Sequence, residues 1–314
     1  MIWYVALAVL LGLALIGALA ALVVTEKRNR PPKPATAGPA VLDREALDVI
    51  DAGLRRLTGE CLRSGRALPD LYGVLYSGER LDLLLAGTED GTPEPWTADE
   101  SGERWTATRE ALERPGPEGE PALPYALTVT VGTVGPDRAL VDLSRATPSV
   151  SVAGPEEDVR RWARAVVTEV LTGPVGGLAE VTLVGSLAMD ETLNGAALRS
   201  SRLYTAASVE EALARTAGAP VAPSGGAASD VTQIFRLIEG RSQVAVEGDA
   251  PHLFLVDASQ LPRREGALDA LRPGDAVLVL GDAPAAWRWR AGADGTLDTG
   301  PLGLRIDRHA GHLG

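Results

Sequence analysis

The stretch SVSVAGPEEDVRRWARAVVTEV, residues 149–170, decides the fold class of this chain. A short β-branched run passes through Gly154 and Pro155 into a pattern whose apolar residues recur every three or four positions. We therefore predict a strand over residues 149–153 and a helix over residues 155–172. Proline suits the first helical position because its missing amide proton would find no partner there.

The alternation of strand and helix continues towards the C-terminus. A capping box of Ser208 and Glu211 begins a further helix. A short strand is predicted at residues 202–204, a short helix at 269–271, and a closing antiparallel hairpin around Asp294. Further strands are predicted over the apolar runs AEVTLVG, HLFLVDA and DAVLVLGDA. Such alternation is typical of an α/β fold, in which a mainly parallel sheet is covered by helices.

The region before residue 149 has the pattern of one helix and several antiparallel hairpins. Asp43 is the expected N-cap of the helix, which has one apolar face. The run DLYGVLYSGERLDLLLAG reads as a hairpin that turns at residues 77–79. ERWTATRE is a further predicted strand, and residues 139–143 are predicted to pair with residues 127–131.

The N-terminal segment has the properties of a membrane anchor. The run from Ile2 to Val24 contains no charged residue and matches the roughly 20 apolar residues that cross a bilayer. A cleaved signal peptide is the alternative, but no basic region precedes the run. The basic sequence TEKRNRPPKP follows directly, so the N-terminus is expected outside and the bulk of the chain in the cytoplasm. Residues 26–41, rich in Pro and Ala, are predicted to form a linker.

Charge and cysteine content narrow the classes of partner. The net charge is −12, and no lysine occurs after Lys33, so no basic stripe suggests a nucleic-acid partner. The single cysteine, Cys61, excludes an intramolecular disulfide and lies on the apolar helix face, where we expect a packed, inert thiol. The expected partners are the lipid bilayer, through Ile2 to Val24, and an unidentified protein. No cofactor is expected.

The junction after residue 153 connects a predicted strand to a predicted helix, as a phosphate-binding loop does, but it lacks the sequence of such a loop. Such a loop reads G-x-x-x-x-G-K-[ST], because backbone amides and the lysine hold the phosphates while the hydroxyl holds Mg²⁺. Here Gly154 and Pro155 are followed by Glu156, Glu157 and Asp158. These acids stabilise a helix start but repel a triphosphate. We therefore predict a plain strand-to-helix junction in a vestigial phosphate-loop position.

Three further residues complete the comparison with a nucleotide site. Asp257 follows the apolar run LFLV and stands where a Mg²⁺-binding aspartate would stand in such a fold. Arg160 or Arg161 in place of lysine would be needed for a degenerate nucleotide-dependent enzyme, which is the alternative interpretation. A third possibility is ligand sensing in a pocket at the carboxyl edge of the sheet.

The remaining candidate residues favour structural roles. His309 and His312 lie in a glycine-rich terminus, which is expected to be a frayed tail with no metal site, because metal binding needs three or four convergent ligands. His252 is expected at the surface or at a strand end. Ser186 lacks the G-x-S-x-G context of a hydrolase nucleophile. No catalytic residue is therefore predicted. Trp287 and Trp289 alternate on one face of the closing hairpin, where core packing is expected and an exposed pair would mark a partner site.

Resemblances to two known families support the prediction of an α/β fold. The run ALVDLSRATPSVSVAGPEEDVRRWARAVVTEVLTGPVGGLAEVTLVG, with HLFLVD and DAVLVLG, resembles the core of FtsK/SpoIIIE-type DNA translocases and type VII secretion ATPases. Residues 42–308, including PYALTVTVG, SVEEALA and DGTLDTGPLGLRI, resemble the central region of actinobacterial membrane-anchored proteins with LysM and bacterial transcriptional activator domains. The catalytic motifs of the first family and both named domains of the second are missing from this sequence. The resemblances therefore imply a fold and no functional residue.

The predicted organisation has four parts. They are a transmembrane helix (1–25), a linker (26–41), an N-terminal helix with hairpins (42–124), and a degenerate P-loop-like α/β domain (125–314). The predicted function is that of a non-enzymatic, single-pass membrane-tethered interaction or scaffold protein of bacterial type. A degenerate nucleotide-binding or nucleotide-hydrolysing protein is the alternative.

Overall fold

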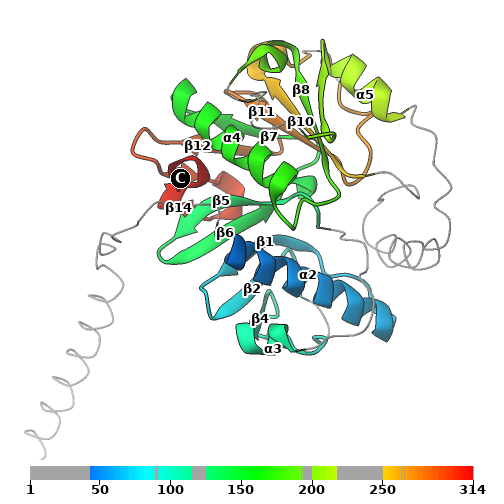
Figure 1. The fold of residues 1–314 in the computed structure, drawn as a ribbon, viewed down its shortest axis with the longest axis vertical. Helices are drawn as coiled ribbons and strands as arrows, with labels where there is room; N and C mark the ends of the chain where they lie inside the picture. The colour runs from blue at the N-terminus through cyan, green and yellow to red at the C-terminus, as the bar shows by residue number, and fades with distance from the viewer. Residues whose placement is uncertain are drawn as a thin grey trace, which may run out of the picture. The chain divides into compact units, whose positions relative to one another are not determined.

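Two sheets and the helices packed on them make up the computed structural model (Figure 1). The structure describes residues 43–88, 91–114, 125–191, 193, 200–217, 250–262, 264 and 266–313. The predicted membrane span and linker lie outside these residues. Among the helices that are described, none is long and apolar enough to cross a membrane.

An eight-stranded sheet confirms the parallel arrangement expected from residue 149 onwards. Its spatial order is β14-β13-β12-β7-β11-β10-β8-β9, and the six strands from β12 to β9 pair in parallel. The strands are β7 (Val150–Ala153), β8 (Glu180–Val184), β9 (Leu203–Ala206), β10 (His252–Asp257), β11 (Ala276–Leu280), β12 (Trp287–Ala291), β13 (Leu297–Asp298) and β14 (Arg305–Ile306).

The predictions for the C-terminal part of this sheet were only partly right. Strands β12 and β13 form the predicted antiparallel hairpin, with Ala291 opposite Leu297. However, β12 also pairs in parallel with β7, which the local sequence pattern did not predict. Residues 269–271, predicted as a short helix, lie in turns. The prediction of a helix there was wrong because the segment 266–275 folds back through successive turns, with Asp269 and Asp275 each donating a backbone N–H three residues back.

The second sheet has seven antiparallel strands in the order β15-β5-β6-β1-β2-β4-β3. The predicted hairpins β1–β2 and β5–β6 are present, and the sheet takes strands from both sides of residue 125. Its strands are β1 (Leu71–Tyr76), β2 (Arg80–Leu85), β3 (Thr97–Ala98), β4 (Arg104–Thr108), β5 (Thr128–Val134), β6 (Asp137–Asp142) and β15 (Arg308–His309).

Two helices of the described chain, α2 and α5, begin at the capping residues that the sequence predicted. The side chain of Asp43 accepts a hydrogen bond from the Ala46 N–H at the start of α2, and Gly65 ends that helix in the left-handed conformation. Ser208 accepts from the Glu211 N–H, as the predicted capping box requires. The helices are α2 (Arg44–Ser64), α3 (Arg109–Glu113), α4 (Glu156–Thr172) and α5 (Val209–Ala217), with short 3-10 turns at Leu143–Arg145, Gly185–Met189, Ala258–Gln260, Gly300–Leu302 and Ala310–His312.

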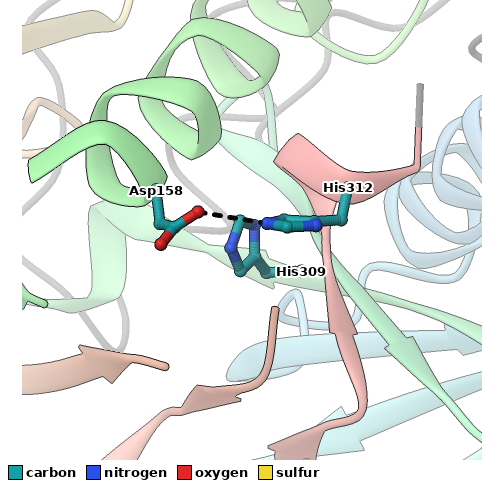
Figure 2. Close-up of side chains that lie close together, drawn as sticks. All are labelled: Asp158, His309 and His312. Atoms are coloured by element: carbon teal, nitrogen blue, oxygen red, sulfur yellow. Dashed lines mark hydrogen bonds and ion pairs between the residues drawn. The ribbon is translucent and has the colours of Figure 1, made fainter. Parts of the chain in front are cut away.

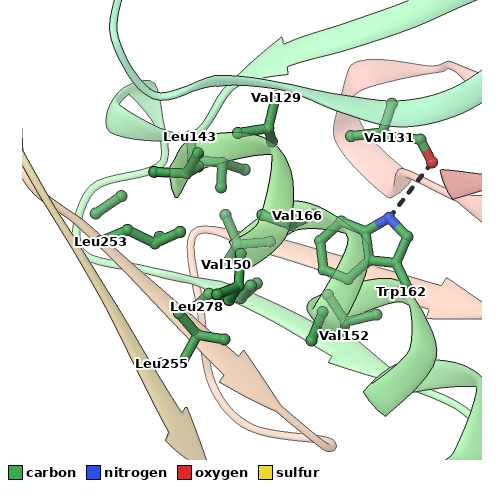
Figure 3. Close-up of a cluster of buried hydrophobic side chains, with 14 of the residues drawn as sticks. Val129, Val131, Leu143, Val150, Val152, Trp162, Val166, Leu253, Leu255 and Leu278 are labelled. Atoms are coloured by element: carbon green, nitrogen blue, oxygen red, sulfur yellow. Dashed lines mark hydrogen bonds between the residues drawn. The ribbon is translucent and has the colours of Figure 1, made fainter. Parts of the chain in front are cut away.

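Helix α4 packs against both sheets, and Trp162 is the centre of this contact. The Trp162 side chain is fully buried and donates its indole N–H to the backbone carbonyl of Val131 at 3.3 Å (Figure 3). Its ring meets Trp289 of the parallel sheet edge to face, with centroids 5.8 Å apart. A single hydrophobic cluster therefore joins β5 and β6 to β7, β10 and β11 through this helix.

A bulge in β5 explains the polar contacts of α4. The β5–β6 register shifts between Thr130 and Gly132, so the bulged strand leaves backbone groups outside the ladder. The carboxylate of Glu169 accepts from the Thr130 N–H at 2.8 Å, while Trp162 donates to the Val131 carbonyl. Helix side chains thus satisfy strand backbone groups that would otherwise be buried without partners.

Replacement of Trp162 is expected to test this shared core. Trp162→Ala removes the largest fully buried side chain between the sheets and should lower the free energy of unfolding by about 3–5 kcal/mol. Trp287→Ala is the matched control and should cost clearly less, because Trp287 is only half-buried. Urea unfolding followed by circular dichroism measures both. Equal losses for the two variants would contradict a central role for Trp162.

Candidate functional site

The strand-to-helix junction is short and closely packed. Strand β7 ends at Ala153 and α4 begins at Glu156, so only Gly154 and Pro155 lie between them. Gly154 has φ 154°, and a Cβ added there would overlap the carbonyl oxygen of Ala291 at the end of β12. The glycine is therefore required by the close approach of β12, whereas in a phosphate loop it would serve the approach of a phosphate.

The carboxyl ends of three parallel strands surround a cavity of about 340 Å³. Gly154 after β7, Asp257 at the end of β10 and Gly281 after β11 all contribute to its wall. The structure thus brings the predicted positions Gly154 and Glu156 next to Asp257, which lies 101 residues after Glu156 in sequence. The full lining is Gly154, Glu156, Val159, Arg160, Asp257, Ala258, Ser259, Leu280 and Gly281.

The charge of this lining is unfavourable for a phosphate. Glu156 and Asp257 each contribute −1 and Arg160 contributes +1, which leaves −1 in total. Arg160 is held by the carboxylate of Glu156 at 2.9 Å and also pairs with Asp190. Its guanidinium is therefore already neutralised within the protein.

Arg161, the other residue considered in place of lysine, is held in the same way. Its guanidinium contacts the carboxylates of Glu157 at 2.7 Å and Asp158 at 3.2 Å, and His312 Nε2 at 3.0 Å. Glu157 thus pairs on the His312 side of the helix and is not part of the cavity wall. Neither arginine is positioned to bind a phosphate without first losing internal ion pairs.

Asp257 has a local structural role. Its Oδ1 accepts hydrogen bonds from the backbone N–H of Ser259 at 2.9 Å and from the Ser259 hydroxyl at 2.6 Å. These bonds cap the 3-10 turn Ala258–Gln260 that follows β10. The same pattern of a strand-end aspartate capping a short turn recurs at Asp142, so this geometry does not by itself indicate Mg²⁺ binding.

The expectation of a frayed C-terminal tail was wrong. His309 pairs with Gly132 in strand β15 and is fully buried, and the following turn, Ala310–His312, packs on α4. A Cβ added at Gly311 would lie 2.7 Å from the backbone nitrogen of Trp162, so only glycine permits this contact. The tail is ordered because its backbone lies directly against the helix.

The tail brings both histidines next to the first turn of α4. His312 Nε2 lies 3.3 Å from Asp158 Oδ1, and the rings of His309 and His312 meet edge to face with centroids 4.4 Å apart (Figure 2). Burial lowers the pKa of His309 to about 4, so its ring is neutral at pH 7. Sequence reasoning missed this cluster because Asp158 and His312 are 154 residues apart.

The interpretation of His252 as a surface or strand-end residue was half right. It opens strand β10, but its side chain is buried, with Nε2 2.7 Å from the Thr182 hydroxyl and Nδ1 3.3 Å from Glu180. Its backbone N–H donates to Asp275 at 2.8 Å. Burial is the main reason why the pKa of His252 falls to about 4.

Four other residues singled out in the sequence are Cys61, Ser186, Trp287 and Trp289, and their contacts in the structure indicate structural roles. Cys61 is buried on α2, and burial raises the pKa of its thiol to about 11, as expected of an inert thiol. Ser186 hydrogen-bonds to Gln260 and not to a histidine. Trp289 is buried and stacks with the half-buried Trp287 at 6.2 Å, which supports core packing.

Comparison with known protein families finds no family model that matches this chain. A search of curated proteins likewise finds no match.

The buried histidines are expected to make stability depend on pH. A pKa of about 4 in the folded state, against 6.5 for an ordinary histidine, means that the unfolded chain binds the proton first. The stability contribution of neutral His252 is therefore present above about pH 6.5 and is lost as pH falls towards 4. The full change corresponds to roughly 3 kcal/mol.

The measurement is the free energy of unfolding in urea between pH 4 and 7.5. His252→Gln should show a clearly smaller decrease on acidification than the unmodified chain. Asp142, whose pKa burial raises to about 6, acts in the opposite direction but is common to both proteins and cancels in the comparison. Identical pH slopes for the two proteins would refute the assignment.

Proposed function

We propose that this chain is a non-enzymatic, membrane-tethered interaction or scaffold protein whose nucleotide position is closed. The proposal gives the α/β region the role of a rigid binding module and gives residues 2–24 the role of a bilayer anchor. The finer description of the fold as a degenerate P-loop domain is part of this proposal. It is supported by the place of the strand-to-helix junction and by the position of Asp257 at a neighbouring strand end.

One observation carries the proposal: the first turn of α4 is filled with internally paired acids. Glu156 pairs with Arg160, and Glu157 and Asp158 pair with Arg161. A helix N-terminus attracts anions, and here carboxylates of the protein itself already occupy that field. A nucleotide triphosphate would have to displace these ion pairs and approach like charge.

The alternative, a degenerate nucleotide-dependent enzyme, requires Arg160 or Arg161 to act as the missing lysine. Both guanidinium groups are held in ion pairs with carboxylates of the protein. Gly154 lies so close to β12 that no space for a phosphate remains beside it. These contacts favour the scaffold role over the enzyme.

A second candidate function is recognition of a small ligand in the cavity beside Asp257. The cavity lies outside the carboxyl ends of parallel strands, where open α/β sheets commonly bind ligands. Its volume of about 340 Å³ is within the range of small-molecule sites. The net negative lining selects a neutral or cationic ligand.

Nucleotide binding is tested by thermal unfolding of the full chain with MgATP. Binding at 100 times Kd would stabilise the fold by about 2.7 kcal/mol, whereas we expect no shift in Tm at millimolar MgATP. Arg160→Ala is the diagnostic variant. A shift in the unmodified chain that Arg160→Ala abolishes would establish the nucleotide alternative and refute the closed site.

A matched pair of variants tests why the site is closed. Glu156→Gln and Glu157→Gln remove negative charge without changing shape. They should still show no MgATP shift, because Arg160 keeps its ion pair with Asp190, Arg161 keeps its ion pair with Asp158, and the short junction remains. A shift that appears only after these substitutions would show that charge alone closes the position.

The proposed orientation is tested by labelling with a membrane-impermeant thiol reagent in intact cells. Cys61 is unsuitable because it is buried and its thiol pKa is raised to about 11. Cys61→Ala combined with Met189→Cys places the thiol at a side chain that is 84% exposed. Protection of this thiol until lysis is expected for a cytoplasmic domain, and labelling of intact cells would refute that orientation. Cys61→Ala alone is the control for background labelling.

A further inference from the structure

Asp158, His309 and His312 bring together three donor groups of the kinds that bind metal ions. One donor atom from each residue lies within 4.8 Å of the other two. In a tetrahedral zinc site with bonds of about 2.0–2.1 Å, neighbouring ligand atoms are roughly 3.4 Å apart. The separation of 3.3 Å between Asp158 Oδ1 and His312 Nε2 already matches this distance. His309 offers a ring nitrogen within 4.8 Å of the other two donor atoms and completes the set of three.

His309 is an independent indication that this cluster binds a ligand. Its side chain is 0% exposed, and within the described part of the chain neither ring nitrogen has a hydrogen-bond partner. A buried imidazole without partners is costly, because its polar atoms have lost water and gained nothing. The ring lies beside His312 and Asp158 (Figure 2), so a cation bound between them would give one of its nitrogens a partner.

Arg161 marks the position that a cation favours. Its Nη1 lies 3.0 Å from His312 Nε2 and 3.2 Å from Asp158 Oδ1, so a guanidinium now bridges two of the three candidate ligands. The same arginine also pairs through Nη2 with Glu157 at 2.7 Å. Arg161 can therefore swing towards Glu157 and retain one ion pair when a metal ion takes its place.

We propose that Asp158, His309 and His312 form a binding site for a divalent transition-metal ion, Zn²⁺ in the first instance. Two imidazoles and one carboxylate form a donor set that suits Zn²⁺ and leaves a fourth position for water or another ligand. The site joins the first turn of α4 to the C-terminal turn Ala310–His312, so bound metal would fasten the chain end to the helix.

The test is calorimetric titration of the chelator-treated full chain with Zn²⁺ alone, using protein without a histidine tag. We expect one Zn²⁺ per chain, and a rise in Tm upon binding because metal binds only the folded site. His312→Gln and Asp158→Asn should each weaken Zn²⁺ binding by at least about tenfold. Co²⁺, titrated in the same way, should give visible ligand-field absorption that these variants lose.

Matched controls separate this site from non-specific binding. Glu156→Gln removes a carboxylate from the same helical turn but contributes no ligand, so it should leave Zn²⁺ affinity unchanged. Arg161→Gln should tighten binding, because it removes the competing guanidinium. Circular dichroism of each metal-free variant verifies folding, and these variants are preferred to replacement of the fully buried His309. Absence of binding, or binding that persists undiminished in both His312→Gln and Asp158→Asn, would overturn the proposal.

Discussion

The contact of α4 with two sheets at once is the constraint on which the rest of the structure depends. Trp162 fills the space between them, meeting Trp289 on one side and the Val131 carbonyl on the other. Glu169, about two turns further along the same face of the helix, accepts a hydrogen bond from the Thr130 N–H. Both bonds end at the β5 bulge, so the helix sequence and the strand irregularity are complementary. A regular β5 would pair these backbone groups within the ladder and leave Trp162 and Glu169 without partners.

The same helix determines the chemistry of its N-terminal end. Its first turn carries three consecutive acids, Glu156, Glu157 and Asp158, and their side chains diverge. Glu156 lines the cavity at the sheet edge, whereas Asp158 faces the C-terminal turn. The acids favour the helix through its dipole and also exclude an anion from the position where a phosphate would bind. A stabilising feature of the helix is therefore incompatible with nucleotide binding at the same place.

The local sequence pattern was sufficient to predict most of the helices and strands. It could not predict which segments that are distant in sequence lie side by side. Turn chemistry predicted the β1–β2 and β5–β6 hairpins, and the alternation after residue 149 predicted parallel pairing, because both signals are short in range. The parallel pairing of β12 with β7 joins segments more than 130 residues apart and leaves no periodic signal in either. The burial of His252 was missed for the same reason: its partners Thr182 and Asp275 come from other segments.

The two candidate sites also differ in how far the sequence could predict them. The cavity wall was partly predictable, since carboxyl ends of parallel strands meet at one edge, and Gly154 and Asp257 each follow a predicted strand. This rule could not predict the histidine cluster, because a glycine-rich terminus has the composition typical of a frayed chain terminus. One signal was available in HAGHLG: two histidines three residues apart lie on one side of a helical turn. That turn can approach α4 because Gly311 has no side chain, and its backbone lies within van der Waals contact of Trp162. The residue that made the tail look disordered in the sequence is thus the one that lets it pack, and its packing places both histidines beside Asp158.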